Sequence, residues 1–254
     1  IILNKSQQTL ALTDINTVRG FINFVQFAQS NNMAPIAGVN LITNVDEIII
    51  LVENDIGYEN MCSIITNYYA NPNCSAVEFL KENSKGLFVI TYQESLLRYL
   101  KYIIPDDRLF IELRPGIQES SARKLSKKYK LEIIATGDVY FSKPLDHIYH
   151  KTLRAIDCNS TLSNLNSNNY KSTEHWFRKE VDMIDLFPSS LDAINNSHYL
   201  AKRCKVEWSF INTIFPGLSL KDTFQANKKL REYTYQGAKK RYQKINSQLK
   251  SRID

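Results

Sequence analysis

Short apolar runs rich in β-branched residues alternate with amphipathic segments as far as Thr136. The runs predict six strands, at Thr9–Thr13, Pro35–Leu41, Glu47–Val52, Gly86–Thr91, Leu109–Leu113 and Glu132–Thr136. Apolar residues at helical spacing predict helices between them, near Thr17–Asn31, Tyr58–Tyr69, Gln93–Tyr102 and Gln118–Tyr129. Strands that are apolar throughout, and that alternate with helices, are typical of βα units on a mostly parallel sheet. The pattern predicts an α/β fold whose sheet is open or closed into a barrel.

Another helical pattern begins at Pro144, a residue suited to the first turn of a helix. Its apolar positions share one helical face: Leu145, Ile148, Tyr149, Thr152, Leu153 and Ile156. We expect this face to be buried, which leaves His147 and His150 on a solvated face.

The remaining chain divides at an expected domain boundary, near Ser209–Pro216. Before it, helices are expected near Thr173–Met183 and Ser190–Cys204. After it comes a helix rich in basic residues. We therefore assign residues 1–210 to the α/β domain and residues 211–254 to a linker and basic helix.

The composition is that of a soluble globular protein, with 43% hydrophobic and 23% charged residues among 254. The net charge of +6 permits a partner such as nucleic acid without requiring one. The four cysteines are scattered and form no C-x-x-C pair, which indicates reduced thiols in a cytoplasmic protein. No apolar run approaches the roughly 20 residues that cross a bilayer, so no membrane association is expected. The chain begins at Ile1 rather than Met, and we expect it to be a fragment.

Three passages resemble the PHP (polymerase and histidinol phosphatase) domain of bacterial DNA polymerase III alpha subunits. They are LALTDINTVRGFINFVQFAQSNNMAPIAGVNL, IIILVENDIGYENMCSI and LEIIATGDVYFSKPLDHIYHKTLRAI. The later segment LREYTYQGAKKRY is similar to the family's lead into the polymerase core. The resemblance implies a distorted seven-stranded βα barrel whose first strand lies before residue 1. It also implies metal ligands at the strand ends, in those members that hydrolyse phosphate esters.

The resemblance can be tested at each ligand position. Asp14 matches the Asp of the family's T-D-H, but Ile15 replaces the His. Asn40 replaces the Glu of P-I-x-G-x-E, and Tyr140 replaces the His that follows Asp138 in N-D-V-H. Isoleucine offers no lone pair, and an amide brings no charge to a divalent ion. We therefore expect no metal and no catalytic residue. The two remaining aspartates either bind one ion weakly or, as we expect, accept hydrogen bonds from backbone N–H groups.

Other candidate ligands are weaker. Glu47 stands about where some family members have a His. His175 is expected early in a short helix without an acidic partner, and His198 is expected as a packed core residue. No G-x-S-x-G, P-loop or G-x-G-x-x-G motif is present, so the usual hydrolase and nucleotide-binding signatures are absent from the sequence.

The basic helix has two readings, a solvated helix face or a nucleic-acid contact. The candidate contact residues are Lys228, Lys229, Arg231, Lys239, Lys240 and Arg241.

The resemblance implies a non-catalytic structural and interaction domain of a replicative polymerase. The implied partners are the polymerase core of the same chain with its Mg, a proofreading exonuclease subunit, and DNA through the full-length protein. One alternative is a PHP phosphoesterase or proofreading exonuclease that uses Mn or Zn. A second alternative is a free-standing nucleic-acid-binding module.

Overall fold

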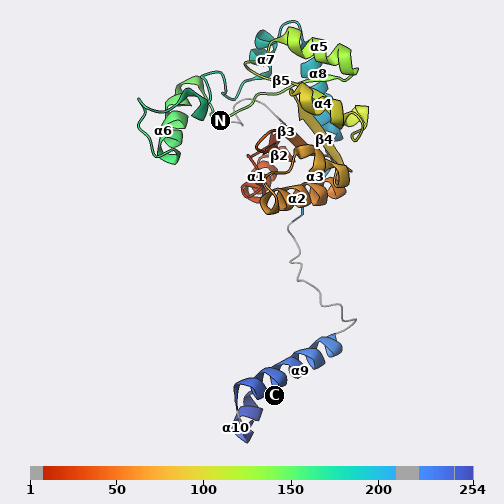
Figure 1. Ribbon diagram of the computed structural model, residues 1–254, viewed down its shortest axis with the longest axis vertical. Helices are drawn as coiled ribbons and strands as arrows, with labels where there is room; N and C mark the ends of the chain where they lie inside the picture. Colours follow the sequence, from red (N-terminus) through yellow and green to blue (C-terminus); the bar gives the residue numbers. More distant parts are fainter. Residues whose placement is uncertain (1–7, 210–222, 243, 254) are drawn as a thin grey trace. The chain divides into compact units, whose positions relative to one another are not determined.

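The computed structural model describes residues 8–209, 223–242 and 244–253 (Figure 1). Contacts between Cα atoms divide the chain into two compact units, Ile1–Glu207 and Trp208–Asp254. The first unit contains the sheet and every position that the sequence offers for metal chemistry. The second contains the basic helix.

The described part of the first unit has a single six-stranded sheet, ordered as in the sequence. The strands are β1 (Thr9–Leu12), β2 (Ala34–Ile42), β3 (Glu47–Val52), β4 (Leu87–Thr91), β5 (Leu109–Leu113) and β6 (Ile133–Ala135). The sheet curls, and β1 and β6 both contribute to the wall of one cavity. This confirms the predicted α/β class and is consistent with a PHP-like barrel. The seventh strand that the resemblance implies has no counterpart among the described residues.

The sheet is mostly parallel, as predicted, except at β3. Strand β3 is antiparallel to both β2 and β4, whereas the other three neighbouring pairs are parallel. Only residues 43–46 connect β2 to β3. A connection this short makes a hairpin, because a parallel crossover needs a dozen residues or more. Within it, the Thr43 hydroxyl accepts a hydrogen bond from the Asp46 N–H at 3.0 Å.

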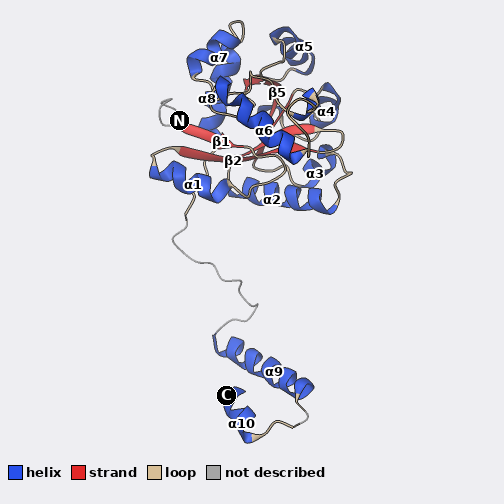
Figure 2. Cartoon of the chain, turned by 90° about the vertical axis from the view of Figure 1, so that its left-hand side faces the viewer, coloured by secondary structure: helices blue, strands red, loops and turns tan. Residues whose placement is uncertain are grey.

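Helices pack around the sheet. Figure 2 shows α1 and α2 along one side of the strands and α5, α7 and α8 on the other. Their bounds are α1 (Phe21–Ser30), α2 (Asp55–Ala70), α3 (Ala76–Glu82), α4 (Glu94–Leu100), α5 (Glu119–Tyr129), α6 (His147–Asp157), α7 (Glu180–Leu186) and α8 (Leu191–Arg203). The helix expected near Thr173–Met183 is wrong in its position, since α7 begins only at Glu180. Helix α3 was not predicted from the sequence.

Two glycines bring α2 against the start of β4. The Asn54 side chain caps α2 by accepting a hydrogen bond from the Gly57 N–H at 3.1 Å. A Cβ on Gly57 would lie 1.9 Å from the carbonyl oxygen of Gly86, and Gly86 itself has a φ of +70°. Only glycine fits at position 57, so α2 lies closer to the backbone of Gly86 than any side chain at this position would allow.

The described part of the second unit consists of α9 (Thr223–Arg241) and α10 (Ser247–Ile253). All six basic residues proposed for nucleic-acid contact lie on α9 and are exposed. No helix in the described ranges is both long enough and apolar enough to span a membrane.

Candidate functional site

Five positions selected from the sequence line one cavity, whose volume is about 880 Å³: Asp14, Ile15, Asn40, Asp138 and Tyr140. They meet because the carboxyl ends of parallel strands lie at one edge of a sheet. Asp14 follows β1, Asn40 lies near the end of β2, and Asp138 follows β6. The rest of the wall is mainly apolar. The structure therefore gathers the positions at which the PHP resemblance places metal ligands.

The reversed direction of β3 adds a carboxylate to this edge. Glu47 is the first residue of β3, and in an antiparallel strand the first residue lies beside the last residues of its neighbours. Its carboxylate accepts hydrogen bonds from Tyr92 Oη at 2.9 Å and from Asn40 Nδ2 at 3.4 Å. Its backbone N–H donates to Gln93 Oε1 at 2.8 Å, which holds the strand end in place.

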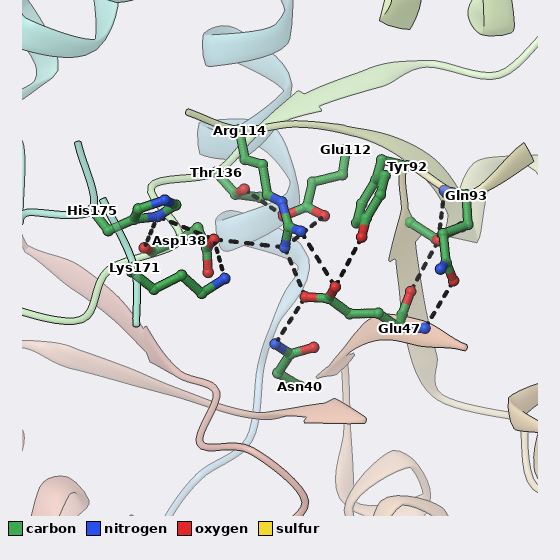
Figure 3. A network of polar contacts seen from close by, with 11 residues as sticks. Asn40, Glu47, Tyr92, Gln93, Glu112, Arg114, Thr136, Asp138, Lys171 and His175 are labelled. Atoms are coloured by element: carbon green, nitrogen blue, oxygen red, sulfur yellow. Dashed lines mark hydrogen bonds and ion pairs between the residues drawn. The ribbon is translucent and has the colours of Figure 1, made fainter. Parts of the chain in front are cut away.

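Arg114, directly after β5, lies at the centre of the polar network in Figure 3. Its two terminal nitrogens donate to the two oxygens of Glu47 at 2.8 and 3.3 Å. The same guanidinium lies 3.6 Å from Asp138 and 3.9 Å from Glu112, and it stacks 4.3 Å from the centroid of the Tyr92 ring. Burial alone would lower the pKa of Arg114. The hydrogen bonds to Glu47 and the charges of the nearby carboxylates outweigh this effect and raise the pKa above its ordinary value. The guanidinium remains a cation.

Asp138 is held by side chains from a distant loop. Its Oδ2 lies 3.0 Å from Lys171 Nζ and 3.1 Å from His175 Nδ1. Burial alone would raise the pKa of Asp138, yet the His175 hydrogen bond and the charges of Arg114 and Lys171 lower it to about 2. The expectation that this carboxylate would accept backbone N–H groups is therefore wrong. The carboxylate contacts the side chains of Lys171 and His175 instead.

Glu112 is the most deeply buried carboxylate of the network, with 2% of its side chain exposed. It accepts a hydrogen bond from Thr136 Oγ1 at 2.7 Å. Burial raises the pKa of Glu112 to about 7, although Arg114 and the Thr136 hydrogen bond act in the opposite direction. This carboxyl group therefore changes its charge near neutral pH.

The other remnant positions are less engaged. In the described residues, the Asp14 carboxylate forms no ion pair, and burial raises its pKa. The backbone oxygen of Asp14 accepts from the Asn40 N–H at 3.1 Å. Asn40 is 5% exposed, and its Oδ1 is a buried acceptor with no partner among the described residues. Ile15 is 45% exposed and brings no polar atom to the cavity. Tyr140 lies under Lys171, whose Nζ is 4.8 Å from the ring centroid.

The charges of the network balance without an added ion. Burial alone would raise the pKa of Glu47, but the hydrogen bonds and charge of Arg114, and the hydrogen bond from Tyr92, lower it. Glu47 and Asp138 are thus anions, and they face the cations Arg114 and Lys171 (Figure 3). Across the ranges that the structure describes, no group of three or more His, Cys, Asp or Glu side chains is arranged to hold a metal ion. Oxygens of Glu47 and Asp138 already contact the side-chain cations Arg114 and Lys171.

The four histidines differ from their predicted roles. His147 and His150 do not face solvent: Nε2 of each lies 3.0 Å from the backbone of Lys171, one from the oxygen and one from the nitrogen. His175 stands outside any helix and does have an acidic partner, Asp138. His198 is exposed and lies 3.1 Å from Glu180, so it is not a core residue. Helical periodicity could not reveal these contacts, because each joins two segments that are separate in the sequence.

Most of the network was missed from the sequence: Tyr92, Gln93, Glu112, Arg114, Thr136 and Lys171. One signal was available. Glu112 is the only charged residue inside the apolar run Leu109–Leu113, and a charge in a buried strand requires partners. Arg114, two residues later, supplies one of them.

The geometry and the comparisons with known proteins agree on the family. The chain belongs to the PHP domain family, whose domain matches residues 2–142. It is similar to the DNA polymerase III subunit alpha of Pseudomonas fluorescens, with 24% identity over 267 residues, 91% of this chain and 23% of the relative. Identity to the DNA polymerase III subunit alpha of Escherichia coli (strain K12) is 27% over 232 residues, 78% of this chain and 20% of the relative. The DNA polymerase III subunit alpha of Buchnera aphidicola is 27% identical over 294 residues, which are 96% of this chain and 25% of the relative.

These relatives confirm the predicted resemblance to the PHP domain of DNA polymerase III alpha subunits. The chain spans about a quarter or less of the length of each of these three relatives.

Proposed function

We propose that this chain is a non-catalytic, architectural PHP unit of a replicative DNA polymerase III alpha subunit. Nucleotidyl transfer, with its Mg, then belongs to a polymerase core that the aligned region of the relatives does not include. The PHP unit supports that core by packing against it. A proofreading exonuclease subunit is the further partner that the resemblance implies.

The observation that carries the proposal is the position of Arg114. A metal-dependent phosphoesterase needs carboxylate and imidazole groups free to hold ions that polarise the phosphoryl group and activate water. Here the guanidinium of Arg114 lies within 4 Å of Glu47, Glu112 and Asp138. A divalent ion at this position would have to displace a partly buried cation that already makes two hydrogen bonds to Glu47. This arrangement supports a structural role for the cluster.

The loss of ligand types supports the same role. Ile15 and Tyr140 replace imidazoles, and Asn40 replaces a carboxylate, in a cavity that still gathers all three positions. The alternative, a phosphoesterase or exonuclease with Mn or Zn, would have to use Asp14 and Asp138. Of these, Asp138 is paired with Lys171.

Metal content and hydrolysis test the proposal together. The chain and the full-length polypeptide would be assayed by elemental analysis, by titration with Mn and Zn, and by hydrolysis of bis-p-nitrophenyl phosphate. We expect metal below stoichiometric amounts and no metal-dependent hydrolysis. The matched variants are Asp138→Ala and Asp185→Ala, since Asp185 is exposed on α7, away from the network. Stoichiometric binding and hydrolysis that Asp138→Ala abolishes and Asp185→Ala preserves would establish the phosphoesterase instead.

A second role, contact with DNA, is favoured by α9. Its six candidate basic residues are all exposed, so the phosphates of a duplex can approach them.

A further inference from the structure

Helix α6 is amphipathic, but its apolar face points outward. The exposed fractions are 51% for Ile148, 69% for Tyr149, 66% for Leu153 and 71% for Ile156. Leu145, in the turn that leads into the helix, is 86% exposed. The prediction that this stripe would be buried is therefore wrong. In Figure 1, α6 stands away from the other labelled helices of its unit.

The opposite, polar face attaches α6 to its own unit. His147 and His150 contact the backbone of Lys171, as described above, and Arg154 Nε donates to the Asn169 oxygen at 2.7 Å. The rings of His147 and His150 also lie 5.8 Å from that of Phe141. A surface helix ordinarily turns its apolar stripe to the core and its polar side to water. Here specific hydrogen bonds hold the polar side inward, and this fixes the apolar stripe as an outer surface.

We propose that this stripe, formed by Leu145, Ile148, Tyr149, Leu153 and Ile156, is the surface on which the polymerase region of the same polypeptide docks. The inference rests on the proposed function and names the surface that it uses. The relatives align with this chain over only 20–25% of their length, so most of each alpha subunit lies outside the aligned region. The stripe carries no charged residue, which suits an apolar groove that accepts one face of a helix. Contiguous apolar surface of this kind marks a binding site in a soluble protein.

Site-specific crosslinking in the full-length polypeptide tests the docking surface. A photoreactive p-benzoylphenylalanine would replace Leu153, or Tyr99 as a control, because Tyr99 has a similar exposed fraction of 63% on α4. We expect the probe at residue 153 to form crosslinks within one polypeptide, to segments outside residues 1–254. The probe at residue 99 should form far fewer. Crosslinks from residue 153 to a second copy or to another protein, or no crosslinks at all, would overturn the assignment.

A substitution gives an independent readout. Leu153→Asp should leave the unfolding of the 254-residue chain nearly unchanged, because the side chain is mostly exposed there. In the full-length polypeptide it should speed proteolytic release of the PHP unit about tenfold or more, since burying a leucine is worth a factor of this size. Tyr99→Asp should not. Equal release rates for the two variants would contradict the proposal.

The outcomes separate this inference from the function on which it rests. Absence of docking at Leu153, in a polypeptide without metal-dependent hydrolysis, would overturn the surface assignment alone. Metal-dependent hydrolysis lost in Asp138→Ala would overturn the proposed function, whatever Leu153 contacts.

Discussion

Replacing Glu112 by Gln should make the protein more stable at high pH. The pKa of Glu112 is raised from its ordinary value of 4.5 to about 7 in the folded protein, chiefly by burial. Well below pH 4.5 the group is protonated in both the folded and unfolded states. Between pH 4.5 and 7 the folded state binds more protons than the unfolded state, so the free energy of unfolding falls as the pH rises. Each pKa unit corresponds to about 1.4 kcal/mol, so ionised Glu112 costs the folded state about 3 kcal/mol above pH 7.

The variant Glu112→Gln keeps the shape of the side chain, offers the Thr136 hydroxyl an amide oxygen, and removes the charge. Urea unfolding followed by circular dichroism, at pH values from 4.5 to 8.5, would give the free energy of unfolding of both proteins. We expect the two to agree near pH 4.5. The variant should then gain up to about 3 kcal/mol over the wild type by pH 8. Glu82→Gln, at an exposed position, serves as the control and should follow the wild type at every pH.

A difference between Glu112→Gln and wild type that does not change with pH would refute the reasoning. It would mean that Glu112 is either ionised throughout, with Arg114 outweighing burial, or solvated in the folded state. A variant less stable than wild type at pH 8 would show that the ionised carboxylate contributes a net favourable contact to Arg114, now 3.9 Å away.

Three further outcomes are expected. Arg114→Met removes the cation shared by the buried carboxylates and should lower the free energy of unfolding at pH 7 by about 3–5 kcal/mol in urea titrations; a decrease below about 1 kcal/mol would contradict its central role. Gly57→Ala should cost about 1–3 kcal/mol or more, because the new Cβ meets the backbone of Gly86, whereas Gly237→Ala, with nothing within 4 Å, should not destabilise α9. Replacing Lys239, Lys240 and Arg241 of α9 by Gln should weaken the salt dependence of binding to duplex DNA, measured by fluorescence anisotropy. The slope of log affinity against log salt should fall by about 0.9 for each phosphate that the variant no longer neutralises. An unchanged slope would show that these three residues have no role in nucleic-acid binding.

The strands were the most readable part of the fold. Strands β3 and β5 have the bounds predicted from the sequence, because strands covered on both faces are apolar at most of their positions. The direction of β3 was not readable from that run. It depends on the four residues 43–46, which form a hairpin, and this direction is what brings Glu47 to the site.

Helix α6 shows a different limit of prediction. Its periodicity identified the helix and its apolar stripe correctly, but not which face turns inward. The orientation depends on hydrogen bonds to the backbone of Asn169 and Lys171, in the connection between α6 and α7. A pattern of apolar positions carries no information about such bonds.

The sequence identified several residues of the candidate site but not the cations that contact its carboxylates. Motif spacing identified Asp14, Asn40 and Asp138, which the structure brings to one cavity. The cations that engage the carboxylates come from other parts of the chain: Arg114 follows β5, and Lys171 lies in a loop 33 residues beyond Asp138. Neither belongs to a motif, so only the three-dimensional arrangement reveals their role.

The guanidinium of Arg114 has a consequence for how the fold depends on its surroundings. A metal ion is an exchangeable component: its occupancy varies with concentration, and a chelator can extract it. A positive charge on an arginine side chain is synthesised with the polypeptide and is present beside the carboxylates from the moment of folding. The electrostatic balance that Arg114 provides at this end of the sheet is thus independent of metal supply. The pH of the solution still affects this balance, because Glu112 changes its charge near pH 7.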